Sequence, residues 1–319
     1  MSELPGAVSI REVGPRDGFQ NEPEIISTEH KVELIDALAR TGVRRLEVTS
    51  FVRPDVIPQL ADAAEVLQRI RVPEEVSVSV LIPNERGLDD ALALREANRS
   101  ARPLFDEVNV FMSASETHNQ SNVNRSIEQS LAGLEVVLAR ALEAGLRCEA
   151  VISTSFGCPY EGRVPPERVF AIAERLHLSG AAEIGFGDTT GMANPLQVRE
   201  FFKAAREHLG PRARGGGVEL TAHFHNTRGQ GLANVLAALE AGVQSFESSF
   251  GELGGCPVPV GATGNIATED LVSMLHEMGI STGVDLPALI ACAQRVQELL
   301  GRPLGSHTLL AGAVDWQGA

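Results

Sequence analysis

The sequence alternates, eight times in succession, between apolar runs of strand length and longer stretches with the apolar spacing of a helix. Strands that alternate with helices in this way are expected to run parallel and to be joined by right-handed crossovers. The strand-like runs are residues 7–13, 43–49, 76–82, 105–112, 146–153, 182–187, 218–225 and 243–248. The helical stretches that follow them are residues 29–40, 57–70, 85–95, 126–144, 165–178, 195–209, 229–241 and 268–278.

Eight strand–helix units between residues 7 and 278 have the number and size of a closed barrel of parallel strands surrounded by helices. The pattern therefore predicts an α/β protein with a (β/α)8 TIM barrel. The glycine-rich turn of a doubly wound nucleotide-binding fold does not follow the first strand-like run. A further helix is predicted at 285–300. We thus expect residues 1–284 to form the barrel and residues 285–319 a C-terminal helical extension packed on it.

Composition excludes several classes of function. The formal net charge is −15, which argues against a nucleic-acid partner, because binding to phosphates needs a concentrated basic surface. No apolar run is long enough to span a bilayer, so no membrane partner is expected. The four cysteines are widely spaced, without zinc-type pairing, and no signal peptide is visible. These features predict a cytoplasmic protein in a reducing compartment.

The polar residues that follow the strands carry the chemistry. His223 and His225 are two residues apart, so in a strand their imidazoles lie on one face and can converge on a metal ion. Asp17, after the first strand, offers a carboxylate, and Asn265 offers a carbonyl oxygen. Two nitrogen and two oxygen ligands suit Mg²⁺, Mn²⁺ or Zn²⁺. The alternatives are histidines satisfied by hydrogen bonds and an aspartate that serves the turn before Gly18.

Two further residues are candidates for catalysis. Arg16 would place a permanent cation beside the ion, where it suits an enolate or carboxylate oxygen, although an ion pair with Glu47 is an equal alternative. Cys256 lies in a Gly-Gly-Cys-Pro segment, and a loop of this kind can place an acid or base over a bound substrate. The alternative for Cys256 is a buried, inert thiol, which is also the interpretation of Cys148 and Cys292.

Six stretches together resemble the 3-hydroxy-3-methylglutaryl-CoA lyase family, which belongs to the DRE-TIM metallolyase superfamily of metal-dependent barrel enzymes. They are REVGPRDGFQNE at 11–22, EVTSFV at 47–52, FGCPYEG at 156–162, GDTTG at 187–191, HFHNT at 223–227, and GGCP followed by GATGNIATEDLV within 254–272. The resemblance covers about residues 7–285, and the Gly-Gly-Cys-Pro segment separates these lyases from the related Claisen-type synthases.

The resemblance implies a metal-dependent retro-Claisen (retro-aldol type) carbon–carbon lyase. The expected substrate is 3-hydroxy-3-methylglutaryl-CoA or a close 3-hydroxyacyl-CoA, and the products are acetyl-CoA and acetoacetate or the matching ketone. A homodimer or higher homo-oligomer is expected. The implied metal ligands, for Mg²⁺ or Mn²⁺ rather than Zn²⁺, are Asp17, His223, His225 and Asn265. The implied catalytic residues are Arg16 for the enolate, Cys256 as acid/base, Glu47 as the residue that orders Arg16, and Asp188 for proton transfer. The implied substrate-binding residues are Gln20, Ser50 and Tyr160.

Two departures from the family pattern leave the acyl group open. Asn226 replaces the aspartate that commonly follows the second histidine, and Val258-Pro259 replaces the common Tyr-Ala after Cys-Pro. A Claisen-type synthase, a pyruvate-type aldolase and a non-catalytic barrel are the alternatives. The CoA site is not legible beyond candidates, namely residues 115–124 and 301–307 with Arg53, Arg125 and Arg163, and a solvated surface role is the ordinary interpretation of each arginine.

Overall fold

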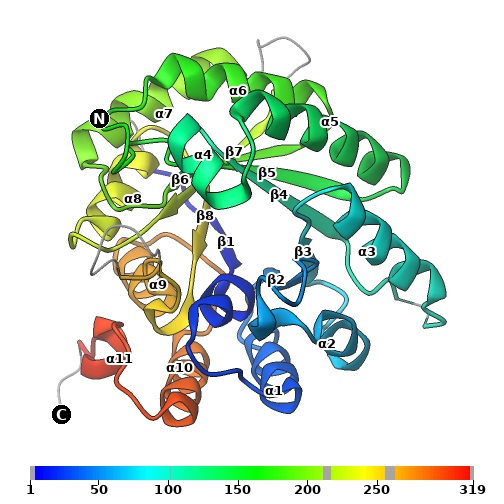
Figure 1. Cartoon of the computed structure of the whole chain (residues 1–319). Helices are drawn as coiled ribbons and strands as arrows, with labels where there is room; N and C mark the ends of the chain where they lie inside the picture. The colour runs from blue at the N-terminus through cyan, green and yellow to red at the C-terminus, as the bar shows by residue number, and fades with distance from the viewer. Residues whose placement is uncertain (1–3, 101, 211–216, 256–262, 317–319) are drawn as a thin grey trace.

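The computed structural model describes residues 4–100, 102–210, 217–255 and 263–316. Within these ranges eight parallel strands close into a barrel in the order of the chain, with β8 bonded back to β1 (Figure 1). The predicted (β/α)8 barrel is therefore confirmed. The strands are β1 (Ser9–Glu12), β2 (Arg45–Ser50), β3 (Ser77–Leu81), β4 (Glu107–Ser113), β5 (Arg147–Ser153), β6 (Glu183–Asp188), β7 (Glu219–Phe224) and β8 (Ser245–Ser248).

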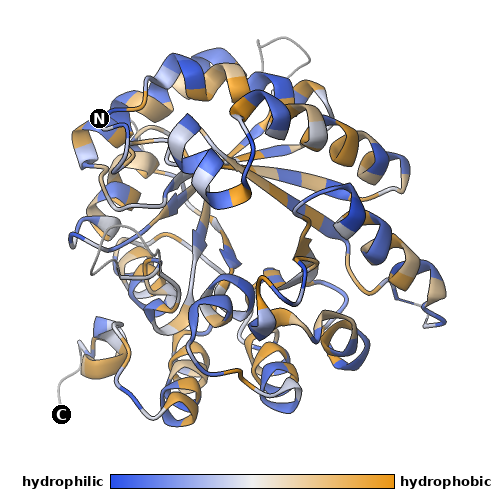
Figure 2. Cartoon of the chain, in the orientation of Figure 1, coloured by the Kyte–Doolittle hydropathy of each residue, from blue (hydrophilic) through white to orange (hydrophobic). Residues whose placement is uncertain are grey.

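Helices surround the barrel and bury one face against the strands. In Figure 2 these helices carry both orange and blue stretches, as expected when one side meets the sheet and the other meets solvent. The helices are α1 (Thr28–Leu38), α2 (Ala63–Arg69), α3 (Glu85–Ala97), α4 (Glu116–Val123), α5 (Ile127–Glu143), α6 (Pro166–Leu178), α7 (Pro195–Leu209), α8 (Gly231–Glu240), α9 (Thr268–Glu277), α10 (Leu286–Leu300) and α11 (His307–Ala311). None of the helices described is long and apolar enough to span a membrane.

Two helical segments differ from the sequence prediction. The single helix expected at 57–70 is a 3-10 turn, η3 (Pro58–Leu60), followed by α2, and Asp62 between them is held by Lys31 and Thr28. The additional helix α4 follows β4. Its residues are mostly polar, so the sequence gives no apolar stripe, but Ser115 caps its first turn by accepting a hydrogen bond from the His118 amide.

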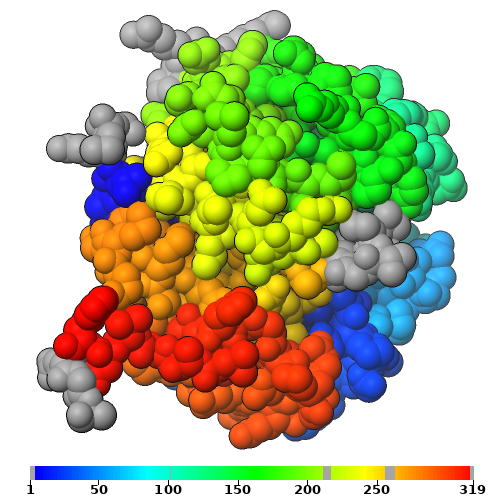
Figure 3. Space-filling view, turned by 90° about the vertical axis from the view of Figure 1, so that its left-hand side faces the viewer, coloured from blue at the N-terminus to red at the C-terminus, as the bar shows by residue number. Residues whose placement is uncertain are grey.

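The C-terminal residues pack against the barrel's helical layer. Helix α10 contacts both α1 and α9, and α11 contacts α9. Asp270 of α9 accepts a hydrogen bond from the backbone amide of Thr308 at 2.6 Å, which fixes the first turn of α11. Figure 3 shows this red segment lying on the orange surface of α9. The division between barrel and extension at residue 284 stays a prediction.

The inside of the barrel contains ion pairs where many such barrels hold layers of branched apolar side chains. Arg11 of β1 is fully buried and contacts Glu107 at 2.8 Å, Glu149 at 2.5 Å and Glu183 at 3.4 Å. Arg45 of β2 contacts Glu107 at 3.1 Å and also pairs with Glu183. The apolar core lies instead between the strands and the helices. A charged network thus supports the floor of the barrel.

Candidate metal centre

The turn after β1 presents Arg16 and Asp17 at the mouth of the barrel. It is a single π-helical turn, η1 (Gly14–Gly18), in which the Asp17 amide donates to the Val13 carbonyl at 2.7 Å. Gly14 packs so closely that a Cβ there would lie 2.5 Å from the Phe250 ring. Because no side chain fits at that position, the glycine allows the turn to sit against the segment that follows β8.

Arg16 is held in place by two carboxylates. Its Nε donates to Glu47 Oε1 at 2.6 Å, and its Nη1 donates to Asp17 Oδ1 at 2.7 Å. Glu47 also accepts a hydrogen bond from Asn109 Nδ2 at 3.1 Å. Arg16 is only 8% exposed and lines the central cavity. The ion pair with Glu47 and the position beside the candidate ion, which the sequence left as alternatives, therefore occur together.

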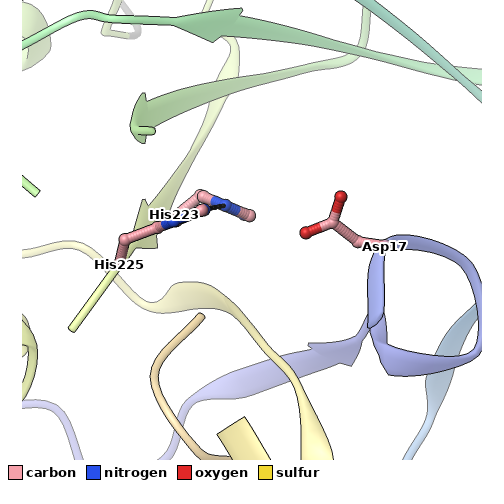
Figure 4. Close-up of side chains that lie close together, drawn as sticks. All are labelled: Asp17, His223 and His225. Carbon is pink, nitrogen blue, oxygen red and sulfur yellow. Dashed lines mark hydrogen bonds between the residues drawn. The ribbon is translucent and has the colours of Figure 1, made fainter. Parts of the chain in front are cut away.

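Asp17, His223 and His225 converge on one point, as Figure 4 shows, with the carboxylate of η1 facing the imidazoles at the end of β7. One ligand atom from each residue lies within 4.8 Å of the others. The Nε2 atoms of His223 and His225 are 3.1 Å apart. Two imidazole lone pairs at that distance repel each other unless a proton or cation lies between them, so this arrangement fits a bound metal.

Asn265 adds a fourth group that fits an ion. It lies opposite His225 in an isolated β-bridge. Its Nδ2 donates to Asp17 Oδ2 at 2.7 Å and to the Leu253 carbonyl at 3.1 Å. These two bonds fix the amide, and its buried Oδ1 has no hydrogen-bond partner. A buried amide oxygen without a hydrogen-bond partner, on a side chain that is fixed against Asp17, suits Mg²⁺ or Mn²⁺.

The surroundings of Asp17 and His225 favour the protonation states of these two ligands that bind cations. Burial raises the pKa of Asp17, but the nearby Arg16 and His223 outweigh it, so the pKa is lowered and Asp17 stays a carboxylate. Burial, followed by the neighbouring His223, lowers the pKa of His225 to about 3. A neutral imidazole and an ionised carboxylate are the forms that coordinate a metal.

A cavity of about 410 Å³ opens over this cluster. Gln20 lines it and donates to Asp17 Oδ1 at 2.8 Å, so this predicted substrate residue also orients a predicted metal ligand. Tyr160 lies at the rim and is about half exposed. Leu81, Phe111 and Val151 add apolar side chains to the wall, and Asn109, His118 and Ser153 are among its further polar residues. The cavity thus joins a charged end to a wall of mixed polarity.

The remaining predicted residues lie around this cavity or outside the described part of the chain. Asp188, at the end of β6, accepts hydrogen bonds from the backbone amides of Met192 at 2.8 Å and Ala193 at 3.1 Å, and it is not among the residues that line the cavity. Burial raises its pKa to about 7, and its Oδ2 has no hydrogen-bond partner. Ser50 lines a neighbouring groove. Cys256 lies outside the described residues.

Sequence reasoning missed Glu247, which lines the cavity and contacts His223. A signal was present, because charged residues recur on the inward side of several strands, as in Arg11, Glu149 and Glu247.

The predictions for two cysteines fit the structure. Cys148 and Cys292 are buried, and burial raises their pKa values to about 12 and about 11.

Comparison with known proteins gives consistent findings. A family model described as HMGL-like matches residues 7–296. A hydroxymethylglutaryl-CoA lyase of Bacillus subtilis is 46% identical, with 96% of this chain and 97% of the relative covered. One of Pseudomonas mevalonii is 42% identical over 96% of each chain. The crystal structure of the B. subtilis HMG-CoA lyase superposes with a TM-score of 0.89 at 44% identity, covering 97% of this chain and 98% of that one. The structure of an Acinetobacter baumannii HMG-CoA lyase in complex with coenzyme A and 3-methylmalate also has a TM-score of 0.89, at 38% identity, covering 100% and 99%.

Proposed function

This chain belongs to the HMGL-like family, and we propose that it is a metal-dependent lyase that cleaves 3-hydroxy-3-methylglutaryl-CoA to acetyl-CoA and acetoacetate. The observation that carries the proposal is the convergence of Asp17, His223 and His225 within 4.8 Å beside the buried Arg16. The names of the relatives, at up to 46% identity over nearly the whole chain, support the same reaction.

The proposed reaction breaks the C2–C3 bond of the substrate. A base takes the proton of the C3 hydroxyl, a carbonyl forms at C3, and the electron pair of the broken bond leaves on C2 as the enolate of acetyl-CoA. That enolate then takes up one proton. Asp17, His223, His225 and Asn265 would hold the divalent ion, which supplies Lewis acidity to the oxygens of the substrate when it is bound.

Arg16 would stabilise the negative charge of the enolate. Its guanidinium is already fixed by Glu47 and Asp17, so little reorganisation is needed when charge develops on the thioester oxygen. Gln20 would keep Asp17 oriented through their 2.8 Å hydrogen bond. An arginine in this position also stays charged at every physiological pH.

Two residues would handle the protons. Asp188 has a pKa of about 7, raised by burial, which suits a group that accepts a proton near neutral pH. It lies between Gly187 and Thr189, which both line the cavity. The family resemblance gives protonation of the enolate to Cys256. Both residues would therefore act in addition to the metal ligands.

The CoA portion of the substrate would lie in a neighbouring groove of about 770 Å³. This groove and the metal cavity are adjacent, since Val52 lines both. Arg53, Arg86 and Arg125 line it, together with Ser50 and the first turn of α3. Cationic side chains and a helix N-terminus both attract phosphates. Two carboxylates, Glu85 and Asp90, are also in the lining, so the positive charge is only partly in excess.

Location and assembly are separate parts of the proposal. The described cysteines Cys148, Cys158 and Cys292 are free, which supports a reducing compartment such as the cytoplasm. A homodimer or higher homo-oligomer stays a prediction.

A direct assay tests the function. Purified protein with Mg²⁺ and 3-hydroxy-3-methylglutaryl-CoA should release acetoacetate and acetyl-CoA in equal amounts, and chelation of the metal should abolish the release. A synthase would instead consume acetyl-CoA in the presence of a 2-oxo acid. An aldolase would cleave a 2-oxo acid substrate that lacks CoA. Absence of acetoacetate from the metal-loaded protein would refute the proposed substrate.

A further inference from the structure

Glu247 occupies a central position in the barrel that the proposed mechanism does not use. It lies on β8, where it pairs in register with Arg11 of β1 on one side and with His223 of β7 on the other. Its side chain is 1% exposed and points inward with theirs. Glu247 therefore connects the charged floor of the barrel with the candidate metal centre.

The contact with His223 determines which nitrogen of that imidazole carries the proton. His223 Nδ1 lies 2.8 Å from Glu247 Oε2. A carboxylate at this distance accepts the Nδ1 proton in a charge-assisted hydrogen bond. The tautomer with its proton on Nδ1 leaves the lone pair on Nε2, the atom that faces His225. Metal-binding histidines commonly have such a carboxylate partner, which sets the ring orientation and makes the ligand nitrogen more basic.

Arg11 places a buried positive charge next to Glu247. Its Nε lies 3.9 Å from Glu247 Oε1, without a hydrogen bond between them, and its Nη1 contacts Glu149 at 2.5 Å. The guanidinium is fully buried. The Glu247 carboxylate therefore has a buried cation on one side and the imidazole to which it is bonded on the other.

We propose that Glu247 is a positioning residue that orients His223 and strengthens it as a metal ligand, with the buried charge of Arg11 beside it. The inference depends on the proposed metal site and adds to it a residue that lies outside the ligand set. Glu247 contacts His223 and is not part of the group of converging ligand atoms, so it would act through His223.

The test compares three variants by their affinity for Mn²⁺, measured from the free Mn²⁺ signal in electron paramagnetic resonance. E247L removes the acceptor at similar volume and should raise the Kd for Mn²⁺ by about 10–100-fold. E247Q keeps an acceptor oxygen but loses the charge, and its Kd should rise severalfold, to a value between wild type and E247L. S245A is the matched control, because Ser245 is on the same strand and bonds within the same charged network without touching His223.

A second readout separates positioning from direct participation in the reaction. At saturating Mn²⁺ the kcat of E247L and E247Q should return to near the wild-type value, because the defect lies in metal affinity. A low kcat at saturating metal, with an unchanged Kd, would overturn the proposal and point to a direct role. Thermal unfolding of the metal-free proteins shows which variants are folded. If E247L does not fold, the Kd and kcat of E247Q test the proposal by the same criteria.

The outcomes also separate this inference from the proposed function. Wild-type protein that binds no Mn²⁺ would remove the metal site and with it the proposed lyase. Wild-type protein that binds Mn²⁺, with E247L and E247Q binding equally well, would overturn the role of Glu247 alone.

Discussion

Replacing Arg16 by methionine should separate catalysis from metal binding. In the folded protein Arg16 Nε donates to Glu47 at 2.6 Å and Nη1 to Asp17 at 2.7 Å. Methionine keeps a similar length but provides no donor for the enolate. Loss of one preorganised donor to a developing oxyanion typically reduces kcat by about 100- to 1000-fold. We expect a reduction of this size, with Mn²⁺ still bound, because none of the metal ligands is changed.

The same substitution leaves Glu47 and Asp17 without their shared cation. Breaking one partner out of a buried ion pair costs about 3–5 kcal/mol, so folding must be verified by thermal unfolding before rates are compared. Arg16→Lys is the matched control. It keeps the charge but loses the forked geometry, and its kcat should lie between those of wild type and the methionine variant.

The assay is steady-state release of acetoacetate at saturating substrate and Mg²⁺, which gives kcat, with Mn²⁺ affinity measured on the same preparations. A folded Arg16→Met variant with near-normal kcat would refute the role of the guanidinium. Loss of Mn²⁺ binding in this variant would instead show that Arg16 maintains the structure of the metal site.

Three further predictions follow from named contacts. Burial raises the pKa of Glu252 to about 7, and the nearby Asn226 side chain partly counters this shift. Asn226→Asp would set two carboxylates close together and should lower the free energy of unfolding by about 1–3 kcal/mol, measured in urea at pH 8, and adding Glu252→Gln should restore it. Arg125→Ala should raise the KM for the acyl-CoA about tenfold and leave unchanged the KM for a short thioester that lacks the nucleotide. An equal effect on both substrates would contradict binding of CoA in this groove. Burial raises the pKa of Glu269 to about 8 from its usual 4.5, so the folded state holds this proton more tightly and stability falls as pH rises from about 4.5 to 8, by up to about 1.4 kcal/mol per pH unit. Glu269→Gln should reduce that slope in unfolding measured at pH 5, 6.5 and 8, and an unaltered slope would contradict the assignment.

The architecture was predictable because its signals are local and repeated. Eight alternations of strand and helix fix a closed parallel barrel, and the carboxyl ends of the strands then meet at one face. Asp17 and the two histidines were predictable for the same reason, since any residue that closely follows a strand lies at that face. In the structure these three residues converge as predicted.

Side-chain contacts between residues of different strands were harder to predict. Glu247 is a single acid in a short strand, and its partners His223 and Arg11 are identified only by the register of three neighbouring strands. Helix α4 was missed because it has no apolar stripe. The break before α2 depends on Asp62, which bonds to Lys31 and Thr28 of another helix. Tertiary partners decided each of these features.

The central claim is that one divalent cation is bound by Asp17, His223 and His225. Pulsed electron paramagnetic resonance on Mn²⁺-loaded protein with ¹⁵N-labelled histidine tests it most directly. We expect one Mn²⁺ per chain with coupling to two histidine nitrogens, reduced to one in His225→Ala. Bound Mn²⁺ without histidine coupling, or no bound Mn²⁺ in the folded protein, would contradict it.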